Sequence, residues 1–508
     1  MATLQALRFA IPLAIACGIA SLKTHAAELR AGVARVEITD RAAGPVHDPS
    51  YVKALVLRDS EKTVALITLD VVAIGGIGPI RNDYLDTVRK RLSQELGILP
   101  THVLINASHC HSAVRSDAAS LTVDAVKQAV QQLTPVWVGA GRGSEDSIQE
   151  NRRIQLKDGS ETDVRRAYSM PFDSDVASMG PIDPEIGLLR LDRTDGTPLV
   201  AVYNFACHPI QGMPTGGNTA DFPGVASRVI EENLGTGVTA LFIQGCAGDI
   251  NPAHYKAVHQ PHDAEPLGNS LGLSVLRGYR TIHTTQDTTL RVVNQIVSVP
   301  LAQDTTQRIA KLELEQEKLV QSLAGTSLTF KTFLPLYIQH RVSGEFPQSF
   351  ASRYLHEKQL GRSDLSHLDA ENQANLNAYL TNIHTMERLT RLQVNLALLR
   401  MHQRDHLSSG KKTLDAEIVG LRVGSFVLVT FPGELTVEIG LAIKKRARGP
   451  HTFVAGYTNG YLYYLPTEAQ RRNTGYAQED CDTLVAPEWR ALFDEQIDVV
   501  LAQLTDGL

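Results

Sequence analysis

Short apolar runs alternate with helix-like segments along most of the chain. Residues 53–70 read as two strands joined by a polar turn, and residues 80–96 carry apolar positions at helical spacing and stop at Gly97, a common helix-ending residue. Residues 123–133 have helical spacing too, whereas TPVWVGAGRG reads as a strand followed by a glycine turn. Further apolar runs occur in VLINASHCHS, VAVYNFACHP, TALFIQGCAGDINP, SFVLVTFPGE and TFVAGYTNGYLYYLPT. This alternation predicts an α/β fold with a layered mixed β-sheet flanked by helices.

Residues 303–407 break this rhythm. Two long amphipathic helix patterns, IAKLELEQEKLVQSL and MERLTRLQVNLALLRM, enclose a looser stretch that contains FKTFLPLYIQHRV. The pattern predicts a helical insertion whose apolar stripe packs on the main domain, with a lid or a dimer contact as alternatives. The FKTFLPLY segment is apolar enough for a core but predicts no clearly exposed patch. The oligomeric state stays open.

The N-terminal residues have the features of an export signal. Arg8 precedes an apolar stretch over residues 9–22, and small residues stand at Ala26 and Ala27. We therefore expect a signal peptide at 1–26, export to the periplasm or the outside of the cell, and one domain over 27–508. A lipid anchor at Cys17 is a weaker alternative. Beyond this segment, the sequence has no run of the roughly 20 apolar residues that a membrane-spanning helix needs.

Composition narrows the class of protein. The 508 residues are 43% hydrophobic and 20% charged, with a net charge of -6 and no basic stripe, so we expect a globular protein without a nucleic-acid partner. Four cysteines follow the predicted cleavage site, which is too few for a fold built on disulfides, although one or two bridges are possible. They are Cys110, Cys207, Cys246 and Cys481.

Several metal-binding residue types stand where apolar strands end. His109 and His111 flank Cys110, and in an extended strand the two imidazoles face the same way. His208 and Glu434 also follow apolar strands, and ligands of open α/β sheets gather at such ends. Two imidazoles, a carboxylate and an open position suit a catalytic zinc ion better than a structural one. The sequence therefore predicts a zinc site at the strand ends.

Other polar residues near these strand ends have simpler interpretations. Cys110 and Cys207 each neighbour a candidate histidine, so in extended backbone they should face away from the metal and act as small buried hydrophobes. Asp249 and Asn251 lie in the glycine-containing segment GCAGDINP, where a tight turn with side-chain capping is the simpler interpretation. We expect Asp70 to be a structural or supporting carboxylate.

Taken together, these motifs resemble those of a known family. NASHCHS, the NRR at 151–153, NFACHP, QGCAGDINP, FPGE and GYLYYLPTEAQRRNTGY look like the successive motifs of the neutral ceramidases, zinc amidohydrolases that split ceramide into sphingosine and a fatty acid. The similarity runs in order from about residue 35 to residue 476. Each motif alone is weak, but six in the right order are a strong signal.

The resemblance implies roles for individual residues. The implied zinc ligands are His109, His208, Glu434 and Tyr464. His111 corresponds to the histidine that handles protons, and Arg152 and Tyr476 to residues that stabilise the oxyanion. The chain departs from the family at Asn251, where ceramidases have a serine, and we expect it to lack the family's C-terminal sandwich domain.

These observations favour a zinc-dependent hydrolase that cleaves an N-acyl amide bond with a metal-activated water molecule. Its substrate would be a small-molecule or lipid-like N-acyl compound. Because we expect neither the family's second domain nor a clearly exposed apolar patch, and only 6% of the residues are aromatic, we expect an amide other than membrane-embedded ceramide. Two alternatives remain: a zinc hydrolase of esters or other small amides, and a noncatalytic lipid- or glycan-binding protein with the same fold.

Overall fold

The computed structural model describes residues 28–164, 170–212, 218–253, 255, 262–343, 351–473 and 477–506. The predicted signal peptide at 1–26 and the predicted site residue Tyr476 lie outside these ranges. Within them, no helix combines the length and the apolar character that crossing a membrane requires.

The body is built around an eight-stranded mixed sheet with the order β12-β11-β10-β5-β1-β2-β3-β4. Two pairs, β3 with β4 and β11 with β12, are parallel, and the other pairs are antiparallel. The two edge strands, β12 and β4, approach each other at one end of the sheet. There the Gln244 backbone N–H donates to Asn106 Oδ1 at 2.9 Å. The strands are β1 (Arg30–Glu37), β2 (Tyr51–Arg58), β3 (Thr63–Leu69), β4 (Val103–Ala107), β5 (Thr134–Ser144), β10 (Glu185–Arg193), β11 (Pro198–Phe205) and β12 (Thr239–Gln244).

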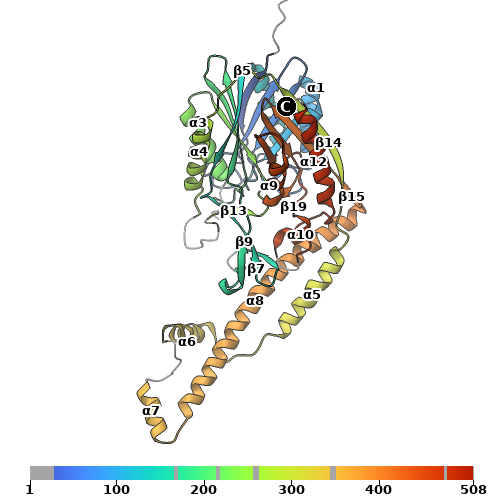
Figure 1. Cartoon of the computed structure of the whole chain (residues 1–508). Coiled ribbons are helices and arrows are strands. Elements are labelled where there is room, and N and C mark those ends of the chain that lie inside the picture. The colour runs from blue at the N-terminus through green and yellow to red at the C-terminus, as the bar shows by residue number, and fades with distance from the viewer. Residues whose placement is uncertain are drawn as a thin grey trace, which may run out of the picture.

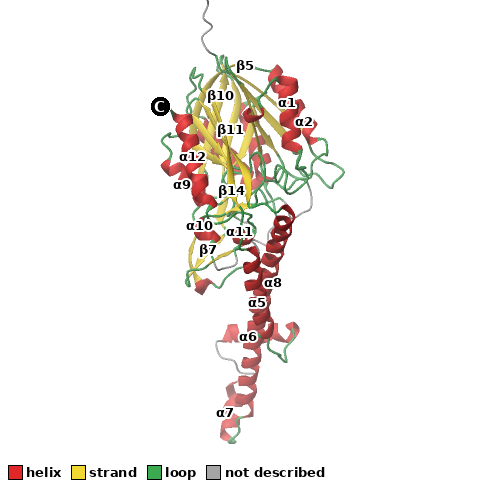
Figure 2. Cartoon of the chain, turned by 90° about the vertical axis from the view of Figure 1, so that its right-hand side faces the viewer, coloured by secondary structure: helices red, strands yellow, loops and turns green. Residues whose placement is uncertain are grey.

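A second sheet, in the order β14-β15-β16-β18, packs on the first, and helices cover both outer faces (Figure 2). Aliphatic and aromatic side chains of both sheets form one buried cluster between them. The strands are β14 (Leu290–Pro300), β15 (Thr413–Val423), β16 (Phe426–Thr430) and β18 (Thr452–Ala455). The first sheet is covered by α1 (Tyr84–Leu96), α2 (Ala118–Gln131), α3 (Asp221–Leu234) and α4 (Glu265–Tyr279). The second sheet is covered by α9 (Val437–Arg446) and α12 (Trp489–Thr505).

The predicted α/β class with a layered mixed sheet is confirmed. Residues 53–70 form the antiparallel pair β2 and β3, and the helix predicted over 80–96 begins at Tyr84 and ends at Gly97, which has a left-handed φ of 67°. Only glycine adopts this conformation without a steric cost, so the sequence signal and the structure agree.

The glycine turn predicted in TPVWVGAGRG is wrong, because β5 continues through these glycines to Ser144. A Cβ atom at Gly139 or at Gly141 would lie 2.5 Å from side-chain atoms of Ile282. The glycines therefore allow the segment after α4 to lie directly against the strand, and they do not end it.

A long helical hairpin projects from one end of the body (Figure 1). It consists of α5 (Thr305–Gln321), α6 (Phe330–Ser343), α7 (Ala351–Gln359) and the 46-residue α8 (Asp364–Ser409). At its root, Ile309, Leu396 and Leu399 form a buried cluster with Cys481 of the body. Farther out, the ion pair of Arg388 with Glu315 at 3.0 Å joins α5 to α8. The expectation that this apolar stripe packs on the main domain holds at the root and where His384 of α8 meets Phe172 of the body, with ring centroids 4.5 Å apart. Elsewhere in the hairpin the helices pack on one another.

Candidate metal centre

His109 is placed by the parallel pair β3 and β4, whose carboxyl ends lie at the same edge of the sheet. After β4 ends at Ala107, the His109 amide N–H donates to the Val71 carbonyl at 2.9 Å, and its own φ of 71° turns the chain. Its ring Nδ1 lies 2.6 Å from the Val72 carbonyl oxygen, which fixes the ring.

The left-handed backbone of His109 contradicts the expectation that His109 and His111 share one face of an extended strand. Their rings are nevertheless close, with centroids 5.5 Å apart, and His111 is exposed.

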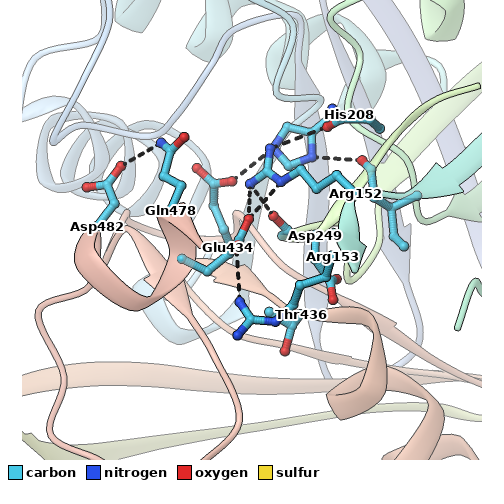
Figure 3. Close-up of polar contacts among 12 residues, drawn as sticks. Arg152, Arg153, His208, Asp249, Glu434, Thr436, Gln478 and Asp482 are labelled. Carbon is cyan, nitrogen blue, oxygen red and sulfur yellow. Dashed lines mark hydrogen bonds and ion pairs between the residues drawn. The ribbon is translucent and has the colours of Figure 1, made fainter. Parts of the chain in front are cut away.

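His208 follows β11 and is held by the short strand β13 (Ile250–Pro252). Its backbone N–H and its ring Nδ1 both lie within hydrogen-bond distance of the Ile250 carbonyl oxygen, at 3.0 and 2.9 Å. The opposite ring nitrogen, Nε2, lies 3.0 Å from Glu434 Oε2 (Figure 3). The ring is therefore oriented from behind by the backbone, and its other nitrogen faces the carboxylate.

Glu434 reaches the same point from the segment that follows β16 of the second sheet. It begins β17 (Glu434–Leu435), which pairs in parallel with β19 (Tyr464–Leu465), so that Glu434 and Tyr464 are neighbours across the ladder. A Cβ atom at Gly248 would lie 2.6 Å from the Glu434 carbonyl oxygen, so this approach requires glycine. The Glu434 carboxylate accepts hydrogen bonds from the hydroxyls of Tyr457, at 3.3 Å, and Tyr461.

The structure brings His109, His208 and Glu434 together in one buried group. One ligand atom from each lies within 4.8 Å of the others, and His109 Nε2 is 3.6 Å from Glu434 Oε1. Three of the four residues predicted as ligands therefore converge, although they lie far apart in the sequence.

The charges of this group suit a cation. Burial lowers the pKa of His109 to about 4 and also lowers that of His208, so both imidazoles are neutral at neutral pH. Burial alone would raise the pKa of Glu434, but the two imidazoles and the Tyr461 hydroxyl hold it below its usual range. Each imidazole Nδ1 lies against a carbonyl oxygen, as is usual for metal-binding histidines, and each Nε2 faces the Glu434 carboxylate. The donor set therefore fits a metal ion.

Tyrosines surround the group, and the sequence did not distinguish among them. The predicted ligand Tyr464 is buried, with its ring stacked 6.5 Å from that of His208. Tyr457 was missed, yet its ring centroid is 4.3 Å from that of His109 and its hydroxyl contacts the carboxylate. Tyr461, also missed, donates to Glu434 as well. The tyrosine-rich stretch GYTNGYLYY was the only sequence signal for these contacts.

Arg152 lies behind Tyr464, with its guanidinium carbon 5.3 Å from the ring centroid. The side chain is buried, and all three nitrogens have protein acceptors. Nε donates to Glu479 Oε1 at 2.7 Å, Nη2 to the Gly248 carbonyl at 2.7 Å, and Nη1 to Asn251 Oδ1 at 3.3 Å. In this arrangement Arg152 packs against the Tyr464 ring and holds the turn after β12 through its hydrogen bonds to Gly248 and Asn251.

Glu479 of the short helix α11 (Gln478–Cys481) was missed by the sequence analysis. It is fully buried and also accepts from Arg153 Nη1 at 3.0 Å, while Asp480 accepts from Arg153 Nη2 at 3.0 Å. The adjacent arginines Arg152 and Arg153 were the available signal, because buried guanidinium groups require carboxylate partners.

Replacement of Glu479 by alanine should strongly destabilise the fold. The change leaves Arg152 and Arg153 buried without their shared carboxylate, and removal of one partner from a buried ion pair costs about 3–5 kcal/mol. Urea denaturation followed by circular dichroism measures this loss. The control Glu488→Ala removes a carboxylate whose side chain is 67% exposed, and it should leave the denaturation midpoint nearly unchanged. Equal midpoints for the two variants would contradict the bracing role.

Asp249 and Asp70 have structural roles. Asp249 Oδ1 accepts the N–H of Val437, the first residue of α9, at 2.8 Å, and burial raises the pKa of Asp249 to about 6. Asp70 Oδ2 accepts the N–H of Tyr51 at 2.8 Å. These contacts agree with a structural role for both carboxylates, although Asp249 binds the start of a distant helix and not its own turn.

The cysteines lie outside the metal-binding group. All four described cysteines are buried and free, so the disulfides considered possible do not form among them. Burial raises the pKa of the Cys110 and Cys207 thiols well above the usual range, which disfavours the thiolate that a metal requires. Neither belongs to the group of His109, His208 and Glu434.

We therefore expect the double variant Cys110→Ala/Cys207→Ala to keep its metal. Elemental analysis of the purified protein by mass spectrometry should give the same metal-to-chain ratio as the unsubstituted chain. A lower ratio in a variant with an unchanged circular dichroism spectrum would show that a thiol is a ligand.

Comparison with known proteins adds a structural likeness. No protein-family model matches the chain, and no curated protein matches it by sequence. The crystal structure of neutral ceramidase from Pseudomonas aeruginosa superposes with a TM-score of 0.59 and 17% identity, over 95% of this chain and 75% of that chain. A structure described as ceramidase complexed with C2 gives a TM-score of 0.57 and 17% identity, over 94% of this chain and 75% of that chain.

Proposed function

Because the chain has a ceramidase-like fold, we propose that it is a zinc-dependent hydrolase that cleaves an N-acyl amide bond. The observation that carries the proposal is the buried group of His109, His208 and Glu434, whose two neutral imidazoles and one carboxylate are directed at one point. A purely noncatalytic binding groove has no need of such a donor set. We further propose that residues 27–508 form the catalytic domain, which is exported by the signal peptide.

We assign distinct roles to the residues around this point. His109, His208, Glu434 and Tyr464 would hold the metal. When bound, zinc supplies Lewis-acid polarisation of the scissile carbonyl and makes a water molecule more acidic. His111 is exposed beside His109, where it can accept a proton from the attacking water and pass it to the leaving amine.

Two further residues complete the proposed site. The resemblance gives Tyr476 a role at the oxyanion, and it lies outside the described residues. It gives Arg152 the same role, but the Arg152 nitrogens donate to protein groups in this structure. We therefore propose that Arg152 supports the oxyanion site through Tyr464 and the turn at Gly248.

The exposure of the FKTFLPLY segment bears on the class of substrate. The expectation that FKTFLPLY forms no exposed patch is wrong, because Phe330 is 62% exposed and Leu334 is 40% exposed. This reason for excluding a membrane lipid therefore fails. We propose a small-molecule or lipid-like N-acyl compound, a class that includes ceramide.

The test is hydrolysis of a substrate panel by protein of known metal content. The panel contains ceramide in mixed micelles, short N-acyl amines, N-acyl amino acids and the matching esters. We expect amide cleavage that a chelator abolishes and added zinc restores. Cleavage of esters alone would favour the esterase alternative, and hydrolysis that is insensitive to metal removal would contradict the proposal.

A further inference from the structure

The far end of the helical hairpin is a distinct surface, here called the hairpin tip, formed by residues 330–343 and 351–362. It includes α7, at the far end of the hairpin, and α6, which lies beside α8 between α7 and the body (Figure 1). The body therefore does not cover it.

Helix α6 is apolar on two faces, but only one of them is packed. Phe333 is buried, and its ring stacks on that of Tyr379 in α8 with centroids 4.6 Å apart. On the other face, four large apolar side chains recur every fourth residue and therefore form one stripe along the helix. They are Phe330, Leu334, Ile338 and Val342, which are 62%, 40%, 52% and 82% exposed.

The rest of the hairpin tip also exposes apolar side chains. Leu355 on α7 and Leu360 just after it are 64% and 53% exposed. Exposed large apolar side chains that recur along one face of a helix mark a surface that contacts another molecule. The hairpin tip therefore has the character of a docking surface.

The charge of this region indicates what it contacts. Residues 330–362 contain five arginines and lysines and two glutamates, so their net charge is 5 − 2 = +3, whereas the whole chain has a net charge of -6. The cations are Lys331, Arg341, Arg353, Lys358 and Arg362. Within α6 itself, Lys331 and Arg341 are the charged residues, and both are basic. The apolar stripe is thus accompanied by positive charge on a chain that is otherwise acidic.

We propose that the hairpin tip docks on an anionic lipid surface. The apolar stripe of α6 lies among the headgroups and upper acyl chains, and the lysines and arginines of the hairpin tip contact anionic headgroups. A second copy of the chain is a poorer partner, because tip-to-tip contact would bring two surfaces of the same positive charge together. This inference does not depend on the proposed amide hydrolysis.

Sedimentation with vesicles tests the proposal on the full chain. One set contains phosphatidylcholine mixed with phosphatidylglycerol, and the other contains phosphatidylcholine alone. We expect binding to the mixed vesicles that weakens as salt is added, and much weaker binding to the neutral ones. Ile338→Glu should lower binding to the mixed vesicles by about tenfold or more. Val342→Glu, at a more exposed position, should do the same, so the result does not depend on the folding of one variant.

Matched controls separate the hairpin tip from general effects. Ile296→Glu changes a 61% exposed isoleucine on β14 of the body and should leave vesicle binding unchanged. Lys331→Glu should weaken binding and reduce its salt dependence, whereas Lys311→Glu on α5 should have little effect.

Three results would overturn the proposal. One is a failure of the unsubstituted chain to bind the mixed vesicles, and another is equal loss of binding in Ile338→Glu and Ile296→Glu. The third is a multimer in lipid-free buffer, detected by light scattering, that Ile338→Glu dissociates while vesicle binding persists. That outcome would assign the apolar stripe to a second copy of the chain.

Discussion

The variant Glu434→Gln should lose its metal and, with it, amide hydrolysis. Burial keeps the imidazoles of His109 and His208 neutral, so the charge of the buried group is the negative charge of the Glu434 carboxylate. Glutamine preserves the shape of the side chain but removes the charge that compensates a divalent cation. Loss of an outer-shell partner alone costs roughly 10- to 100-fold in metal affinity, so loss of this carboxylate should cost more.

Competition with a chromogenic chelator measures the metal affinity of Glu434→Gln independently of activity. The control Glu438→Gln changes an exposed glutamate on α9 in the same segment and should retain both metal and activity. If Glu434→Gln bound zinc as tightly as the control does, the carboxylate would not be a ligand and the centre as assigned would be wrong.

The variant His111→Ala should keep its metal but lose roughly 100- to 10,000-fold in kcat, the usual contribution of a general acid–base group. His111 is exposed beside His109 and is assigned to proton transfer, so its loss should affect the chemical step and leave the buried group intact. Metal content and kcat measured on the same sample separate these two effects.

Asn251→Ala provides the comparison for His111→Ala. Asn251 is buried and accepts a hydrogen bond from Arg152, so its loss should affect the turn more than the reaction. At equal stability, a larger loss of kcat in Asn251→Ala than in His111→Ala would show that the asparagine amide, and not the histidine, takes part in the chemical step.

Much of the fold could be predicted because strand and helix periods are local signals. The paired strands β2 and β3 follow directly from hydrophobic spacing, and the helix that ends at Gly97 follows from hydrophobic spacing and a glycine cap. Candidate ligands were found for a related reason, because His208 and Glu434 each follow an apolar run and parallel strands end at a common edge.

The remaining features depend on contacts that no local pattern encodes. The left-handed turn at His109 is imposed by the neighbouring segment after β3, so the extended geometry assumed for it does not occur. Glu479 and Arg152 are 327 residues apart in the sequence. The glycines of β5 looked like a turn because their real partner, Ile282, is distant in the chain.

The helical hairpin also determines how the protein moves through solution. At 1.5 Å per residue, the 46 residues of α8 extend for about 69 Å, whereas a compact body of about 400 residues has a radius of gyration of roughly 21 Å. Such an elongated particle experiences more friction than a sphere of equal mass and tumbles anisotropically. Its Stokes radius therefore overstates its mass, and a monomer eluting early from a sizing column can be mistaken for a dimer.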